Sequence, residues 1–176
     1  MVTADLRELQ RRALGLRLLF TDVDGVLTDG GVYYGEGGEE LKRFDVRDGM
    51  GVELLREAGV ATAFLTRERS PSVQRRAEKL GIERIFLGVR DKLAFVEERR
   101  AAEGLETGQL AAIGDDVNDL PLLRAVCLEG ITGAPADAQP AVREWVHFRC
   151  TRAGGGGAFR EFAEWLLALR RGGGSQ

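Results

Sequence analysis

Residues 18–30 read LLFTDVDGVLTDG, and this stretch decides how the rest of the chain is interpreted. Its apolar start is typical of a buried strand, and two carboxylates, Asp22 and Asp24, follow where the apolar run ends. Ligands of parallel α/β sheets collect beyond the carboxyl ends of the strands, so both carboxylates are predicted to lie in a site. Because a turn at Gly25 re-aims the second carboxylate, the two can serve different roles. The alternative interpretation is a strand followed by an ordinary Asx turn.

The composition is that of an ordinary globular protein. Hydrophobic residues make up 44% and charged residues 30% of the 176 residues, and the formal net charge is −3. This charge gives no reason to expect nucleic-acid binding, and no apolar run is long enough to cross a bilayer. Cys127 and Cys150 lack metal-ligand spacing and no signal peptide is recognised, so we expect a cytoplasmic protein. The single histidine, His147, argues against a multi-histidine metal site or a Ser-His-Asp triad.

Strands alternate with helices along the chain, which predicts βαβ units. We expect strands at residues 17–21, 60–65, 84–87, 110–113, 126–128 and 145–148, helices at 5–14, 50–58, 70–80, 92–103, 118–125, 138–143 and after 157, and a frayed end at 170–176. Two β-prone runs, 30–34 and 40–44, flank a Gly-rich turn and predict a hairpin. The expected fold is a single α/β domain over residues 1–176. It is a Rossmann-like three-layer sandwich with a mostly parallel sheet, a β-hairpin insertion after the first strand, and no cap domain.

Further polar residues follow the other predicted strands. Thr66 ends the second strand, Lys92 opens a helix after the third, and Asp115 and Asp116 follow the fourth. All these strand ends lie on one edge of a parallel sheet, beside the two carboxylates of the first strand. Clustered carboxylates repel each other unless a cation is present, and oxygen ligands favour Mg²⁺. Carboxylates, a lysine and a hydroxyl around Mg²⁺ suit phosphoryl transfer with a carboxylate nucleophile.

In order and spacing, these elements resemble the motifs of the haloacid dehalogenase (HAD) superfamily of phosphatases, over roughly residues 18–125. The resemblance implies that Asp22 is the nucleophile and a Mg²⁺ ligand, and that an aspartyl-phosphate forms on it. It implies that Asp24 is the general acid/base and offers its backbone carbonyl to the metal. Asp115 is implied as the acidic metal ligand.

The resemblance also assigns the remaining residues at the strand ends. Thr66 is implied as the phosphate-binding hydroxyl and Lys92 as the motif lysine, with Asp116 and Asp119 in supporting roles. One position departs from the pattern, because the superfamily usually has Thr-Gly where this chain has Thr66-Arg67. A side chain at this turn either obstructs the substrate or donates to it.

Over nearly its full length the chain is similar to a small, capless branch of the superfamily. This branch includes phosphatases of eight-carbon and nine-carbon 2-keto-3-deoxy sugar acid phosphates, which serve lipopolysaccharide or sialic acid biosynthesis. The matching segments are DVDGVLTDGGVYY, GEELKRFDVRDGMGVELL, RRAEKLGI, GVRDKL, IGDDVNDLPLL and RAGGGGAFREF. The resemblance implies a homotetramer built by the hairpin, in which neighbouring subunits cover each other's sites.

Within that branch, further residues are implied to contact the substrate. Asp48 and Gly49 are expected to line its site, and the loop 152–157 is expected to close over a site, that of a neighbour by the resemblance. The residues after the motif threonine are linked to substrate choice. Glu68 and Lys79 stand where nine-carbon enzymes carry a glutamate and a lysine, and Arg67 stands beside them.

The interpretation is therefore a Mg²⁺-dependent phosphatase of a 2-keto-3-deoxy sugar acid phosphate. The nine-carbon 2-keto-3-deoxynononate 9-phosphate is slightly favoured over the eight-carbon 3-deoxy-manno-octulosonate 8-phosphate. One alternative is a catalytically weak oligomerisation or regulatory module that keeps the fold. Another is a HAD phosphatase of different specificity.

Overall fold

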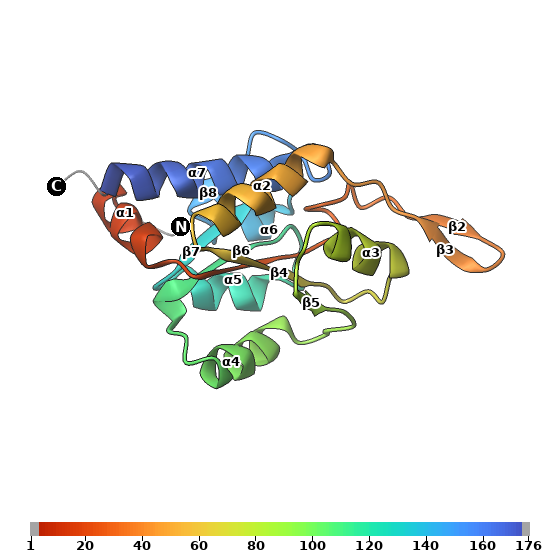
Figure 1. The fold of residues 1–176 in the computed structure, drawn as a ribbon, viewed down its shortest axis with the longest axis horizontal. Coiled ribbons are helices and arrows are strands. Elements are labelled where there is room, and N and C mark those ends of the chain that lie inside the picture. Colours follow the sequence, from red (N-terminus) through yellow and green to blue (C-terminus); the bar gives the residue numbers. More distant parts are fainter. Residues whose placement is uncertain (1–3, 174–176) are drawn as a thin grey trace.

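The computed structural model of the protein describes residues 4–173, and in it a parallel six-stranded sheet lies between two layers of helices (Figure 1). The sheet order is β5-β4-β1-β6-β7-β8. Its strands are β1 (Leu18–Thr21), β4 (Ala61–Leu65), β5 (Arg84–Phe86), β6 (Leu110–Ile113), β7 (Ile131–Ala134) and β8 (Phe148–Arg149). The helices are α1 (Leu6–Gly15), α2 (Val46–Glu57), α3 (Pro71–Lys79), α4 (Lys92–Ala102), α5 (Leu120–Val126), α6 (Pro140–Arg143) and α7 (Ala158–Gly173), with a 3₁₀ turn at Thr107–Gln109.

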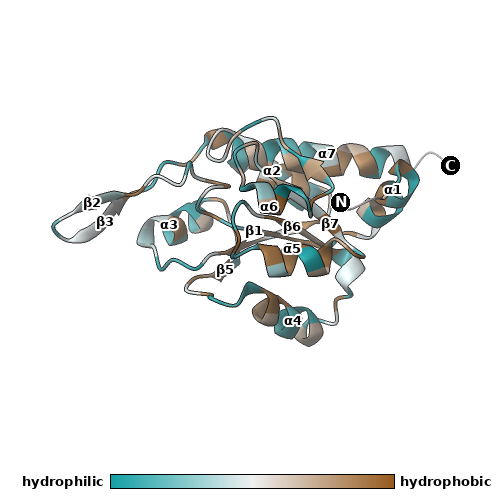
Figure 2. Ribbon diagram, turned by 180° about the vertical axis from the view of Figure 1, so that it is seen from behind, coloured by the Kyte–Doolittle hydropathy of each residue, from teal (hydrophilic) through white to brown (hydrophobic). Residues whose placement is uncertain are grey.

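The central strands separate two hydrophobic cores. Every residue of β1 is buried, as expected for a parallel strand covered on both faces. Leu19 faces a core formed with α1, α2, α3 and α7, whereas Leu18 and Phe20 face a second core formed with α4, α5 and α6. Seen from behind, α7 carries hydrophobic and hydrophilic residues side by side, as an amphipathic helix on such a core does (Figure 2). The three-layer α/β fold expected from the sequence is thus confirmed, and no cap domain is evident among residues 4–173.

The inserted hairpin consists of β2 (Tyr33–Gly35) and β3 (Gly38–Leu41) and extends away from the body of the molecule (Figures 1 and 2). Its strands pair antiparallel as a separate two-stranded sheet and are shorter than expected. A β-bridge between Thr28 and Phe44 closes its base. The stem of the hairpin is therefore fixed next to the turn that follows β1.

Two expected elements were wrong. No strand forms at 126–128, because Val126 belongs to the buried face of α5 with Leu122 and Leu123. The strand lies instead at β7. In the sequence this stretch looks like a loop, because Gly130 and Gly133 flank its first two residues. Glycine is required at Gly133 in this strand because a Cβ there would lie 2.7 Å from the Phe162 ring of α7.

The element boundaries also differ from expectation at several places. Helix α2 begins at Val46 rather than Met50, because the Asp45 side chain accepts a hydrogen bond from the Arg47 backbone N–H and caps it. The last strand is β8, a few residues later than the expected 145–148. Residues 170–173, expected to be frayed, continue α7, while residues 174–176 lie outside the described part of the chain. Of the helices described, none combines the length and apolar character needed to span a membrane.

Arg170 connects α7 to the ends of two other helices. Its guanidinium donates to the backbone carbonyls of Ala13 at 2.7 Å, Leu16 at 3.2 Å and Ala58 at 3.2 Å. These carbonyls lie at the C-terminal ends of α1 and α2, where helices leave acceptors without an internal partner.

We expect Arg170→Met to lower the free energy of unfolding by about 2 kcal/mol, because it leaves partly buried carbonyls without donors. Urea unfolding followed by circular dichroism measures this change. Arg171→Met is the matched control, since Arg171 is exposed and next in sequence, and it should stay within about 0.5 kcal/mol of the unmodified protein. Equal stability of the two variants would contradict the prediction.

Candidate active site

Asp22 lies directly after β1, at the edge of the sheet where the carboxyl ends of the parallel strands meet. Its backbone N–H donates to the Ile113 carbonyl of β6 at 3.0 Å, so the sheet pairing continues through this residue. Its side chain is 7% exposed, and Oδ1 accepts from the Val23 backbone N–H at 2.7 Å. Oδ2 lies 2.8 Å from the Lys92 Nζ. The carboxylate is thus buried and held in one orientation.

Lys92 connects two buried carboxylates. It opens α4, and its Nζ lies 2.8 Å from Asp22 Oδ2 and 2.5 Å from Asp119 Oδ1. The other oxygen of Asp119 accepts the backbone N–H groups of Asp115 at 3.0 Å and Asp116 at 3.3 Å. Asp119 therefore fixes both the lysine and the loop after β6, which agrees with a supporting role.

Three carboxylates, those of Asp22, Asp115 and Asp119, have oxygens within 4.8 Å of one another. Burial, and next the negative charge of Asp119, raise the pKa of Asp22 well above its usual range. Burial, followed by the charges of Asp119 and Asp116, raises the pKa of Asp115 to about 7. Asp115 Oδ1 is buried without a hydrogen-bond partner in the described residues. Because both Asp119 oxygens are already engaged, Asp22 and Asp115 are the residues that fit a hard divalent cation.

The backbone conformation and the close packing at position 25 require a glycine after the two aspartates. Its φ is +85°, a conformation that other residues rarely adopt, and a Cβ there would lie 2.1 Å from Asp115 Oδ2. The turn after Asp24 thus lets the loop after β6 approach the loop after β1. This approach brings Asp115 to Asp22.

Asp24 lies at the same turn, and its partner is a residue to which the sequence interpretation gave no role. Its Oδ1 lies 2.6 Å from the Nζ of Lys42, whose side chain is fully buried. Lys42 follows β3 in the stem of the hairpin. The only sequence signal was its place in the segment GEELKRF, since a lysine in a segment with three other charged residues otherwise indicates an exposed position.

A cavity of about 240 Å³ opens over these carboxylates. Thr66 is buried at the end of β4, and its Oγ1 accepts the Glu68 backbone N–H at 3.1 Å, which shapes the turn that carries Arg67 and Glu68. Arg67 is exposed at the rim and does not fill the cavity. Asn118 is a lining residue that the sequence interpretation did not single out. The lining comprises Asp22, Asp24, Thr66, Arg67, Glu68, Asp115, Asp116 and Asn118.

Three expected substrate residues do not line this cavity. Asp48 is 2% exposed, and its Oδ1 accepts the Arg160 backbone N–H at 2.9 Å in the first turn of α7. Gly49 faces α3, where a Cβ would lie 2.9 Å from Leu80. Lys79 is exposed at the C-terminal end of α3. Because α2 begins earlier than expected, Asp48 belongs to the interface between α2 and α7 instead.

The glycine loop 152–157 packs against the turn after β1 of its own chain. Gly155 donates to the Val26 carbonyl at 3.0 Å, and a Cβ on Gly154 would lie 1.9 Å from the Gly25 carbonyl oxygen. No side chain other than glycine's hydrogen fits at Gly154 without moving the backbone. The expected closure over a neighbour's site remains a prediction.

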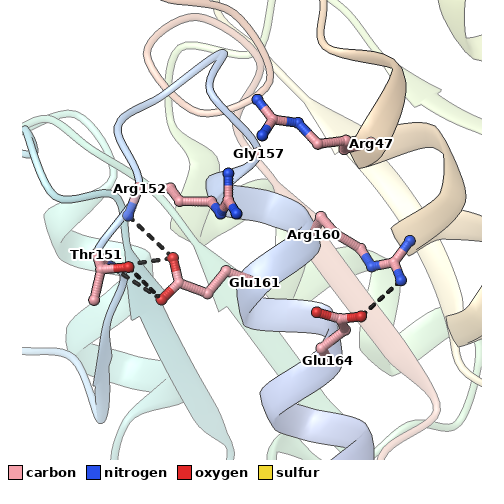
Figure 3. A pocket seen from close by; sticks show the side chains of 7 residues that line it. All are labelled: Arg47, Thr151, Arg152, Gly157, Arg160, Glu161 and Glu164. Carbon is pink, nitrogen blue, oxygen red and sulfur yellow. Dashed lines mark hydrogen bonds and ion pairs between the residues drawn. The ribbon is translucent and has the colours of Figure 1, made fainter.

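A larger cavity of about 500 Å³ lies beside this loop, between the starts of α2 and α7 (Figure 3). Arg160 and Arg47 are paired there with Glu164 and Asp45, and Glu161 accepts from the backbone N–H groups of Thr151 and Arg152. No nucleophile of the predicted set lines it. The predicted catalytic residues Asp22 and Asp24 line the smaller cavity instead.

Comparisons with known proteins agree with this geometry. No family model matches the chain. The 3-deoxy-D-manno-octulosonate 8-phosphate phosphatase KdsC of Yersinia pestis is 40% identical over 157 residues, which are 89% of this chain and 82% of that protein. A solved structure of the Moraxella catarrhalis phosphatase, in complex with a magnesium ion, a phosphate ion and a KDO molecule, superposes with a TM-score of 0.88. It is 33% identical, with 97% of each chain covered.

A second solved structure, the cobalt-bound octulosonate phosphatase of Haemophilus influenzae, gives a TM-score of 0.85 at 38% identity. It covers 92% of this chain and 93% of that one. Fold and site thus define a phosphomonoester hydrolase of the HAD type. The chain belongs to the family of the KdsC phosphatases within the HAD superfamily.

The buried carboxyl of Asp48 predicts a pH-dependent stability. Burial raises its pKa from 3.8 to about 6. The folded protein therefore binds this proton more tightly than the unfolded chain, and the stabilisation present below about pH 4 is lost as the pH rises through 6. Asp48→Asn removes this titration while keeping an acceptor for the Arg160 N–H.

We expect the stability of Asp48→Asn relative to the unmodified protein to increase by about 2 to 3 kcal/mol between pH 4 and pH 7. Urea unfolding of both proteins at several pH values measures this difference. A difference that does not change with pH would show that folding leaves the pKa of Asp48 at its value in the unfolded chain.

Proposed function

We propose that this protein releases inorganic phosphate from a 2-keto-3-deoxy sugar acid phosphate, with Mg²⁺ as cofactor and an aspartyl-phosphate as intermediate. The observation that carries the proposal is the buried Asp22–Lys92–Asp119 arrangement beneath a cavity that Asp115 also lines. It combines a fixed nucleophile, a cation to balance charge, and ligands for a metal. The magnesium and phosphate named for the Moraxella catarrhalis structure support this assignment.

In the proposed first step, an Asp22 carboxylate oxygen attacks the phosphorus in line with the ester oxygen. The P–O ester bond breaks, and Asp24 donates a proton to the departing alkoxide. In the second step Asp24 takes a proton from water, which attacks the aspartyl-phosphate and regenerates Asp22. The two carboxylates suit these separate roles because different lysines hold them, Lys92 for Asp22 and Lys42 for Asp24.

The surrounding residues bind and neutralise the phosphate. Asp22, Asp115 and the backbone carbonyl of Asp24 would hold Mg²⁺, which supplies charge neutralisation at the phosphate when bound. Lys92 offsets the negative charge of Asp22 as the phosphoryl group arrives. Thr66 lines the cavity and offers a hydroxyl to a phosphate oxygen.

Substrate choice rests on the relatives and on the turn after Thr66. The relatives are named for the eight-carbon octulosonate 8-phosphate, which makes it the first candidate. Glu68 lines the cavity and would accept hydrogen bonds from sugar hydroxyls, whereas Arg67 at the rim would pair with the substrate carboxylate. The nine-carbon ester stays the second candidate on the strength of Glu68, because Lys79 lies outside this cavity.

Phosphate release from a panel of esters tests the proposal, with Mg²⁺ present and after chelation. The panel contains the eight-carbon and nine-carbon sugar acid phosphates and 4-nitrophenyl phosphate. We expect Mg²⁺-dependent turnover with at least a 10-fold preference in kcat/KM for one of the two sugar acids over the aryl ester. Turnover of the aryl ester alone would reject this substrate class, and no turnover at all would favour a regulatory module.

Asp22→Asn is expected to lower phosphate release by at least about 1,000-fold, because an amide cannot form the aspartyl-phosphate. Asp5→Asn makes the same chemical change at the exposed cap of α1 and should leave turnover unchanged. Mass spectrometry after acid quenching should detect one added phosphoryl group on the unmodified protein only. Substantial activity of Asp22→Asn would place the nucleophile elsewhere.

We propose further that the protein is a homotetramer in the cytoplasm, assembled through the hairpin. Tyr33, Tyr34 and Leu41 of the hairpin are 62%, 73% and 62% exposed, an unusual number of large apolar groups on one small projecting element. Both cysteines are buried and free, which suits a reducing compartment.

Leu41→Asp combined with Tyr34→Asp should convert the tetramer to smaller species, because it places charges in the proposed contact. Sedimentation velocity at micromolar concentration measures the change. Leu128→Asp is the control, since Leu128 is 70% exposed in the turn after α5, away from the hairpin. A monomeric unmodified protein, or a tetramer insensitive to the hairpin changes, would contradict the assembly.

A further inference from the structure

Lys42 is a fully buried lysine in the stem of the hairpin. Burial of an ammonium group costs several kcal/mol of hydration and is tolerated when the charge is paired. Its Nζ lies 2.6 Å from Oδ1 of Asp24, whose side chain remains 24% exposed towards the cavity. Lys42 itself does not line that cavity.

The two oxygens of Asp24 have different surroundings. Oδ1 is held by Lys42 and lies 3.4 Å from the Thr28 hydroxyl. Oδ2 is buried and has no hydrogen-bond partner among residues 4–173. A carboxylate anchored through one oxygen cannot rotate freely, so the other oxygen keeps a defined direction.

The hairpin stem fixes the position of Lys42. A β-bridge between Thr28 and Phe44 joins the two ends of the stem, and Lys42 lies two residues before Phe44. The neighbouring Arg43 points outward instead, where it pairs with Asp29 at 2.8 Å and also donates to the Gly155 carbonyl at 3.2 Å. Adjacent positions of the same segment therefore alternate between the site and solvent, as in an extended chain.

We propose that Lys42 is the positioning residue of the general acid: it holds Asp24 through Oδ1 and so keeps the carboxyl in one orientation for proton transfer to the leaving group. This inference rests on the proposed function, in which Asp24 donates that proton. It assigns the hairpin stem a part in the chemistry, separate from any part of the hairpin tip in assembly. Lys92 cannot replace Lys42, since it is engaged by Asp22 and Asp119.

The test compares kcat/KM of Lys42→Met on two esters, because kcat/KM reports the steps up to loss of the leaving group. An alkyl phosphate, the preferred sugar acid ester, needs a proton on its leaving group, whereas 4-nitrophenolate leaves without one. We expect a loss of at least about 50-fold on the alkyl ester and of less than about 3-fold on the aryl ester, within the range of general acid catalysis. Arg11→Met, which breaks an exposed pair with Glu8 on α1, should change neither value more than about 2-fold.

A double-mutant cycle separates positioning from structure. In an Asp24→Asn background, Lys42→Met should have less than a 3-fold further effect, since the group it positions is already lost. Lys42→Arg keeps the cation and should retain more alkyl-ester activity than Lys42→Met, and it carries the comparison if Lys42→Met does not fold. Equal losses on both esters, or additive effects in the cycle, would overturn the inference while leaving the phosphatase in place. An unmodified protein that cleaves no ester would instead reject the proposed function and this inference with it.

Discussion

The structure depends on one buried ammonium group shared between two carboxylates. Lys92 sits between Asp22 and Asp119, and Asp119 in turn binds the backbone of the loop that carries Asp115. Removal of Lys92 would leave two buried carboxylates without their cation, which is far more costly than the loss of a surface pair. This constraint fixes the relative positions of three strand ends. Asp115 is held next to these residues because its backbone is bound by Asp119.

The sequence was sufficient for the fold and for the residues that share the sheet edge. Asp22, Asp24, Thr66 and Asp115 follow parallel strands, and parallel strands deliver their carboxyl ends to one edge whatever the details of packing. The alternation of buried strands and capped helices is a local property, which is why most elements were predicted within a few residues. The misplaced strand near residue 126 shows the limit, because a short apolar run fits a helix face as well as a strand.

Other features depend on packing between distant segments and could not be predicted. Lys42 has the flanking residues of an exposed lysine, and only the path of the hairpin stem buries it against Asp24. Asp48 was expected at the substrate, yet an earlier start of α2 turns it towards α7, where it accepts the Arg160 N–H. Neither outcome follows from spacing, since both are set by how two elements meet in space.

The contact between Gly154 and Gly25 links the turn after β1 to the loop before α7. Backbone meets backbone there, with no side chain to adjust, so the positions of the turn and of the loop depend on each other. Phe159, Phe162 and Leu166 of α7 are fully buried in the core on this face of the sheet. The geometry at the sheet edge is therefore coupled to the packing of the C-terminal helix, although the two are far apart in the sequence.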